Sequence, residues 1–349
     1  MRRLPLLLAV AALAQCKRRV PEPDPRSHGR EPEGTRTVEQ ASSLVNSAGS
    51  VMPIASSSAP AWLSNRGASA QASADGSPPT DASVGGGTVR FAVIGDYGAD
   101  TPGEGAVATM VKGWQPEFLI TLGDNNYPTG EAASIDTNIG KFYAEFIGNY
   151  RGRFGPGSAQ NRFWPSPGNH DWIVGLTPYL EYFTLPGNER YYDVDLGLVH
   201  LYALDSDVRE PDGITDESRQ AAWLKQRLAA SKSCYDIVYF HHPAYSTSEH
   251  GSALPLRWPF RKWGADVVFA GHDHTYERLE VDGIPYFVNG LGGASKYDFP
   301  LTPIPETKFR YNEEFGAMRV TATPTAIAYE FFTIDGKKRD AFTKSGPCR

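Results

Sequence analysis

Cysteine and long runs of basic residues are scarce in this sequence of 349 residues. Only three Cys are present, so the chain can form no more than one internal disulfide. The formal net charge is −6, and the lack of a Lys/Arg run argues against a nucleic-acid-binding surface. Hydrophobic residues make up 40% of the chain and charged residues 21%, so a sizeable core can be buried.

The first residues are typical of an export signal. An apolar run at 4–14 follows two Arg residues and is too short to span a bilayer. Two cleavage sites remain open. The sequence at 12–14 fits an ordinary signal peptide, whereas 13–16 resembles a bacterial lipoprotein box in which Cys16 is lipidated, although Gln15 departs from that box. We therefore expect export, either as a lipoprotein on the membrane or periplasmic side or as a secreted protein.

The composition changes after this segment. Residues 17–87 are dominated by Pro, Ser, Ala and Gly and show no apolar periodicity, which predicts a disordered linker. A single catalytic domain is expected at 88–349. If Cys16 is removed or lipidated, Cys234 and Cys348 remain and can pair in an oxidising compartment, although sequence does not show whether they lie close enough.

The domain alternates strands and helices in its first part and is richer in strands later. The β-branched and apolar runs predict strands at 89–94, 118–122, 237–240 and 267–270, a hairpin at 191–194 and 198–204, and further strands at 284–288, 318–323 and 326–333. Helical spacing predicts helices at 104–114, 138–150, 218–230 and 254–263. The early strand–helix–strand order favours βαβ units in an α/β domain.

Five strand ends carry polar side chains, often beside Gly. They deliver Asp96, Asp124, Asn169, His241, and the pair His272 and His274. Taken alone, the segment after the second strand is equally well explained as an Asx turn. Five of the eight His lie in these motifs, however, and the carboxyl ends of strands are where open α/β sheets bind ligands. The pattern therefore predicts a functional site.

The residue types at these ends indicate metal binding. Carboxylates, imidazoles, an amide and a phenol without Cys favour a catalytic rather than a structural site. They are too many for one ion and suit two ions about 3.5–4 Å apart that share a carboxylate. In extended backbone His272 and His274 point to the same side and can reach adjacent metals, whereas His241 and His242 point apart, so that only one is expected to be a ligand. The phenolate of Tyr127 suits Fe(III).

These motifs occur in a specific order: Gly95-Asp96-x-Gly98, Gly123-Asp124-x-x-Tyr127, Gly168-Asn169-His170-Asp171, Val238-x-x-His241 and Gly271-His272-x-His274. The series resembles the calcineurin-like metallophosphoesterase superfamily. Tyr127 points to its purple acid phosphatase branch, and the segment 241–251 is similar to the small, tartrate-resistant type. The resemblance implies a four-layer αββα sandwich of two mixed β-sheets flanked by helices.

The resemblance also implies roles for individual residues. It assigns Asp96, Tyr127 and His274 to Fe(III); Asn169, His241 and His272 to a divalent ion (Fe, Zn or Mn); Asp124 to both ions; and His170 and His250 to the phosphate and the leaving group. Asp171, His242 and Asn125 are expected around these residues or against the substrate. Asp205 is a further candidate there, although a turn at its strand end explains it better.

The implied reaction is hydrolysis of small phosphate monoesters, with a metal-bound hydroxide attacking phosphorus in line. Two alternatives stay open. The same centre can serve a phosphodiesterase or a nucleotide-phosphate hydrolase. The other alternative is a tethered protein that binds phosphorylated ligands without turnover, which predicts a broken ligand set. The sequence does not specify the oligomeric state.

Overall fold

The computed structural model describes residues 87–346 and 348. The expected signal segment at 1–16, with Cys16, and the expected linker up to residue 86 lie outside the described residues, and both remain predictions. Within the described part of the chain, no helix has the length and apolar character needed to cross a membrane.

A mixed sheet of six strands carries the first three polar motifs of the sequence at the ends of its strands. Its order is β13-β12-β11-β1-β2-β3, in which β1, β2 and β3 are parallel and the other neighbours are antiparallel. Its strands are β1 (Val89–Ile94), β2 (Phe118–Leu122), β3 (Phe163–Ser166), β11 (Gly316–Thr323), β12 (Ala326–Thr333) and β13 (Lys338–Ser345). β3 lies at the edge, where Pro165 is tolerated.

A second mixed sheet has seven strands in the order β10-β8-β9-β7-β6-β5-β4. Its central strands β5, β6, β7 and β9 are parallel, and the outer strands are antiparallel. The strands are β4 (Tyr192–Asp195), β5 (Val199–Ala203), β6 (Tyr235–Tyr239), β7 (Val267–Ala270), β8 (Tyr276–Val281), β9 (Ile284–Asn289) and β10 (Thr307–Tyr311). The expected hairpin is confirmed as β4 and β5.

The two sheets pack face to face around one core. Aromatic rings from both sheets meet there: Phe287 of β9 lies 5.1 Å from Tyr329 of β12, and Tyr276 of β8 stacks on Phe331 of β12 at 4.0 Å between ring centroids. All four side chains are fully or almost fully buried. Burying this apolar surface is the main term that holds the sheets together.

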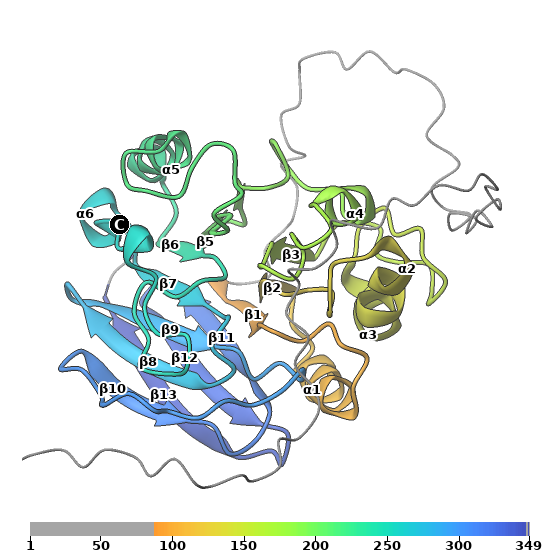
Figure 1. Ribbon diagram of the computed structural model, residues 1–349. Helices are drawn as coiled ribbons and strands as arrows, with labels where there is room; N and C mark the ends of the chain where they lie inside the picture. Colours follow the sequence, from red (N-terminus) through yellow and green to blue (C-terminus); the bar gives the residue numbers. More distant parts are fainter. Residues whose placement is uncertain (1–86, 347, 349) are drawn as a thin grey trace, which may run out of the picture. The chain divides into compact units, whose positions relative to one another are not determined.

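Helices cover the outer sides of the sheets (Figure 1). They are α1 (Pro102–Gly113), α2 (Ala132–Ile135), α3 (Lys141–Tyr143), α4 (Thr177–Tyr182), α5 (Arg219–Ala230) and α6 (Phe260–Trp263). A second apolar cluster joins Leu224 and Leu228 of α5 to Val238 of β6. Two mixed sheets with flanking helices confirm the fold that the motif resemblance implied.

Two predicted helices are wrong in extent. Residues 138–150 form no single helix, because a π-helix (Asp136–Gly140), α3 and a 3₁₀ turn (Ala144–Phe146) follow one another. At Gly140 the chain runs close to the phenol oxygens of Tyr150 and Tyr182, where a Cβ would lie only 2.7 Å from the latter. In the range 254–263 two Pro residues leave only a 3₁₀ turn (Leu254–Leu256) and α6. The sequence also did not reveal α4.

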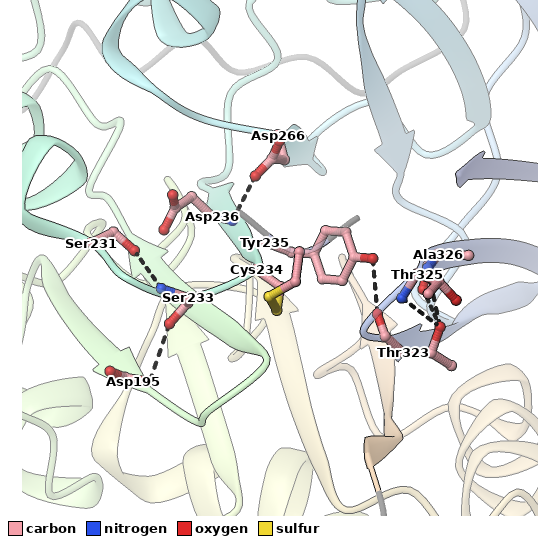
Figure 2. Close-up of a disulfide and its surroundings, with 11 residues drawn as sticks. Asp195, Ser231, Ser233, Cys234, Tyr235, Asp236, Asp266, Thr323, Thr325 and Ala326 are labelled. Carbon is pink, nitrogen blue, oxygen red and sulfur yellow. Dashed lines mark hydrogen bonds between the residues drawn. A yellow bond between two sulfur atoms is a disulfide. The ribbon is translucent and has the colours of Figure 1, made fainter. Parts of the chain in front are cut away.

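A disulfide joins Cys234 and Cys348, whose Cα atoms are 4.6 Å apart. Cys234 directly precedes β6, and Cys348 follows the C-terminal strand β13 of the other sheet. Figure 2 shows Cys234 next to Tyr235, whose hydroxyl donates to the Thr323 carbonyl at 2.9 Å. The bridge therefore lies at the amino end of β6, while the polar motif lies at its carboxyl end.

Candidate metal centre

The polar motifs follow the carboxyl ends of strands in both sheets. Asp96, Asp124 and Asn169 follow β1, β2 and β3 of the six-stranded sheet. His241 follows β6 of the seven-stranded sheet, and β7 leads to His272 and His274. Because β1–β3 and β6–β7 are parallel sets, each sheet brings its motifs to one edge. Hydrogen bonds between the two sets show that these edges meet.

The first group of donor atoms contains Asp96, Asp124 and His274, whose ligand atoms all lie within 4.8 Å of one another. The Tyr127 hydroxyl lies among them. It is 3.0 Å from Oδ2 of Asp124, 3.0 Å from Nε2 of His274 and 3.4 Å from Oδ1 of Asp96. Ser295 lies 2.6 Å from Nδ1 of His274 and so fixes the imidazole with Nε2 facing the group.

The second group contains Asn169, His241 and His272. Nε2 of His241 lies 2.9 Å from Oδ1 of Asn169 and 3.1 Å from Nδ1 of His272. Nδ1 of His241 donates to the Leu122 carbonyl at 2.8 Å, which leaves Nε2 free to bind an ion. Oδ1 of Asp124 is 3.3 Å from Nε2 of His241, so the two oxygens of this carboxylate face the two groups.

His242 also lies within 4.8 Å of the ligand atoms of His241 and His272. Its hydrogen bonds argue against a ligand role. Ser206 Oγ accepts the backbone N–H groups of His241 and His242 at 3.2 and 2.9 Å, so its own proton is available for Nδ1 of His242 at 3.0 Å. This leaves the proton of neutral His242 on Nε2. Burial and the charge of His241 lower the pKa of His242 to about 3.

Three of the candidate ligands have a left-handed backbone. Asp96, Asp124 and His272 have φ angles of 55°, 51° and 69°. Such angles are unfavourable for residues with a Cβ and concentrate at functional sites. His272 is therefore not extended, and the expected extended geometry of His272 and His274 is wrong. The two imidazoles still reach adjacent groups, because the turn directs one to each.

The electrostatics of the site favour bound cations. Asp96 and Asp124 are buried together, with 0% and 2% of their surfaces exposed, and two neighbouring carboxylates are costly inside a protein unless positive charge offsets them. Burial opposes a charged imidazole, but Asp124 and Asp96 outweigh it and raise the pKa of His241 to about 10. Burial and the same carboxylates raise the pKa of the Tyr127 phenol, so a phenolate there needs a cation beside it. The donor set thus fits metal ions of high charge.

His170 and His250 lie at the rim of the two groups. The His170 backbone N–H donates to Oδ1 of Asp124 at 2.9 Å, and its Nδ1 donates to the Pro128 carbonyl at 2.6 Å. Nε2 of His170 is 3.8 Å from Oδ2 of Asp124, and a third of the side chain is exposed. The His250 ring stacks on His272 at 4.2 Å between centroids. Both imidazoles are therefore available to a substrate.

Asn125 and Asp171 brace the turn after β2, where the sequence placed them. Oδ2 of Asp171 accepts from the Gly168 N–H at 2.8 Å and from the Asn125 side-chain amide at 2.9 Å. Burial and Asp124 raise the pKa of Asp171 to about 6. Asn126, for which the sequence suggested no role, ties this turn to the next helices through Ser134 and Asn138.

Sequence reasoning missed Asp273 and did not see how Asp205 acts. Oδ1 of Asp273 accepts the His250 N–H at 2.9 Å, and its Oδ2 accepts from the Ser246 hydroxyl, so it holds the His250 loop. Oδ2 of Asp205 accepts from the Trp172 indole at 2.9 Å. For Asp273, the one local signal of its role was its position between two motif histidines. For Asp205 there was no local signal, because its partner Trp172 lies 33 residues away in the sequence.

Comparison with known proteins places the chain in a family. Residues 89–276, more than half of the chain, match the calcineurin-like phosphoesterase family. Tartrate-resistant acid phosphatase type 5 of Sus scrofa is 24% identical over 71% of this chain and 84% of its own length, and that of Rattus norvegicus is 27% identical over 59% and 72%.

Solved structures share the fold. The purple acid phosphatase PPD1 from yellow lupin (Lupinus luteus) seeds superimposes with a TM-score of 0.59 at 19% identity, covering 74% of this chain and 54% of that one. GAP50, the anchor in the inner membrane complex of Plasmodium, does so with a TM-score of 0.58 at 18% identity, covering 76% and 90%.

The chain therefore belongs to the calcineurin-like phosphoesterase family. It is a hydrolase that acts on phosphoric ester bonds, and its resemblance to purple acid phosphatases of the tartrate-resistant type is confirmed.

Proposed function

We propose that this protein hydrolyses small phosphate monoesters at a binuclear metal centre of the purple acid phosphatase kind. The observation that carries the proposal is the position of Asp124 between two groups of donor atoms. One of its oxygens faces Tyr127 and the other faces His241, at 3.0 and 3.3 Å. A carboxylate shared in this way suits two ions about 3.5–4 Å apart.

The two groups of donor atoms differ in chemistry, so each would bind a different ion. Asp96, Tyr127 and His274 would hold Fe(III), because anionic oxygen ligands favour a trivalent cation. Asn169, His241 and His272 would hold a divalent Fe, Zn or Mn ion through one amide oxygen and two imidazoles. When bound, such ions polarise phosphate oxygens and lower the pKa of water.

His170 is the residue best placed to protonate the leaving group. Nδ1 donates to the Pro128 carbonyl, which accepts only, so Nε2 carries a proton only when the imidazole is cationic, and that proton is the one that can be given up. Hydrolysis leaves negative charge on the departing oxygen, and a proton from Nε2 of His170 would neutralise it. His250, stacked on His272, would contact the phosphate from the other side.

Metal analysis with a visible spectrum of the purified protein tests this function. We expect one Fe and one divalent ion per chain and a tyrosinate–Fe(III) absorption band. Tyr127→Phe should remove the band. Colourless protein that contains only zinc or manganese would refute the Fe(III) assignment.

Kinetics on a phenyl phosphate and on its bis-phenyl diester test the substrate class. We expect the monoester to have the larger kcat/KM. The reverse order would favour the phosphodiesterase alternative. Stoichiometric binding of phosphorylated ligands without turnover would instead favour the tethered binding protein.

We further propose that the protein works outside the cytoplasm. The apolar segment at 4–14 and the candidate lipid-bearing Cys16 suggest export, and the Cys234–Cys348 disulfide supports an oxidising compartment. Fractionation of cells that express the full chain tests this. Recovery in the cytoplasm with both Cys reduced would refute it.

A further inference from the structure

The Arg209 side chain links the turn after β5 to the backbone of the segment that contains Asn169 and His170. Its Nη2 donates to the Asn169 carbonyl at 3.1 Å, and its Nη1 donates to the Trp172 carbonyl at 2.9 Å. β5 belongs to the seven-stranded sheet, whereas this segment follows β3 of the six-stranded sheet. One guanidinium therefore holds together loops from both sheets.

Asp207 fixes the orientation of this guanidinium. Nε and Nη2 of Arg209 donate to the two oxygens of Asp207 at 2.6 and 2.7 Å, which is a bidentate fork. Asp207 is almost fully buried, whereas the Arg209 side chain is 42% exposed. Nε, Nη1 and Nη2 all donate to the carboxylate or to the two carbonyls, and these four hydrogen bonds restrain the guanidinium.

The turn that carries Arg209 is itself anchored. Asp205 accepts from the Trp172 indole through its side chain, and its backbone N–H donates to Oε1 of Gln220 in α5 at 2.8 Å. The Gln220 amide returns a hydrogen bond to the Asp205 carbonyl at 2.9 Å. The segment after β3 is thus linked through Trp172 and Asp205 to α5, the helix that packs on the seven-stranded sheet.

Asn169, whose carbonyl Arg209 binds, also has its side chain in the second group of donor atoms. Asn169 presents Oδ1 at 2.9 Å from Nε2 of His241, and the next residue, His170, donates its backbone N–H to Asp124. A neutral amide is the weakest ligand of the proposed set, so its contribution depends on how accurately its backbone is held. The carbonyl that Arg209 binds belongs to that same residue.

We propose that Arg209 is a positioning residue for the divalent ion: it holds Asn169 where its amide can bind the ion and His170 where it can reach the leaving group. The inference rests on the proposed binuclear centre. Arg209 reaches this segment through two backbone carbonyls and not through a candidate ligand side chain, so it acts through the position of the backbone.

Affinity for the divalent ion tests the proposal. In Arg209→Ala a chelator competition should show divalent-ion binding weaker by about 10–100-fold, as for other partners that orient ligands, with the tyrosinate–Fe(III) band retained. Arg209→Lys keeps a positive charge beside buried Asp207 but cannot form the fork, so it should fold normally and still lose affinity. Arg219→Ala is the matched control: this side chain is 81% exposed, pairs with Asp212 and should bind the ion as the parent protein does.

Hydrogen exchange of the backbone amides at 168–173, compared between parent and variants at equal metal occupancy, gives a readout that is separate from divalent-ion affinity. Arg209→Ala should speed exchange there, and Arg219→Ala should not. Unchanged exchange in Arg209→Ala would overturn the positioning role. Faster exchange with unchanged divalent affinity, or equal loss of both ions, would overturn the link to the divalent ion. If the parent protein binds no divalent ion, the proposed function fails, while the exchange data still decide whether Arg209 orders this segment.

Discussion

Glycines beside the candidate ligands set how closely the ligands can approach one another. A Cβ on Gly123 would lie 2.6 Å from Nδ1 of His241, and one on Gly271 would lie 2.5 Å from Oδ2 of Asp96. A Cβ on Gly168 would overlap both the backbone nitrogen and Oδ1 of Asp124. The motif glycines are therefore required by contact with ligand side chains and not only by turn conformation.

Gly168→Ala is expected to displace Asp124 and abolish the shared position of its carboxylate. Because Asp124 faces both donor groups, we expect metal content and kcat to fall by at least about tenfold. Gly113→Ala is the matched control, since a Cβ there meets nothing within 4 Å at the end of α1. Metal analysis and steady-state kinetics on both variants check this. Normal metal content in Gly168→Ala would show that the turn adapts.

The helix α1 begins close to the site and buries an acidic residue in its first turn. Thr101 caps the helix by accepting the Glu104 N–H at 3.1 Å, and Pro102 occupies the first turn. Oε2 of Glu104 accepts the N–H groups of Ala99 and Asp100, which fixes the loop after Asp96. Oε1 of Glu104 has no hydrogen-bond partner among the described residues.

This environment predicts a pH-dependent stability. Burial raises the pKa of Glu104 well above its ordinary value, although the two backbone N–H groups oppose the shift. The native state then binds the proton more tightly than the unfolded state, so stability falls as pH rises above the unfolded pKa of about 4.3. Glu104→Gln keeps the acceptor without the charge. Urea unfolding at about pH 5 and about pH 8 should show it gaining stability relative to the parent at the higher pH. A difference that is the same at both pH values would contradict the buried charge.

At the scale of the whole molecule, the two sheets are joined covalently as well as by their core. The Cys234–Cys348 disulfide connects positions 114 residues apart, and Lys344 of β13 pairs with Asp266 at 2.8 Å near the same place. Closing so long a loop removes entropy from the unfolded chain. The bridge thus stabilises the fold from the end opposite the motifs.

Replacing both Cys with Ser should lower the free energy of unfolding by about 2–4 kcal/mol. kcat should change little, because the bridge lies at the amino end of β6, whereas His241 follows its carboxyl end. Thermal unfolding of the double variant and of the reduced parent protein, which should coincide, checks the stability. A double variant that unfolds like the oxidised parent would show that the bridge contributes nothing.

Much of the site was predictable because its signals are local. A short apolar run followed by Gly and a polar residue marks a strand end, and five such ends occur in order along the chain. The same local pattern located β1, β2, β6 and β7 close to their observed bounds. It failed at 138–150, where the helical run begins earlier, at Ala132, contains a π-helix at Asp136–Gly140 and ends in a 3₁₀ turn at Ala144–Phe146. It also missed α4.

The sequence by itself determined which residues are candidate donors and at which strand ends they stand, since both follow from residue type and short-range periodicity. Only the tertiary structure decided how they meet. Asn169 lies against His241, 72 residues further along the chain, and Asp124 lies between two groups that each combine residues from both sheets. Arg209 braces the backbone of Asn169 from a turn whose sequence shows no motif. Such contacts depend on how the two sheets pack, and a local pattern does not encode that packing.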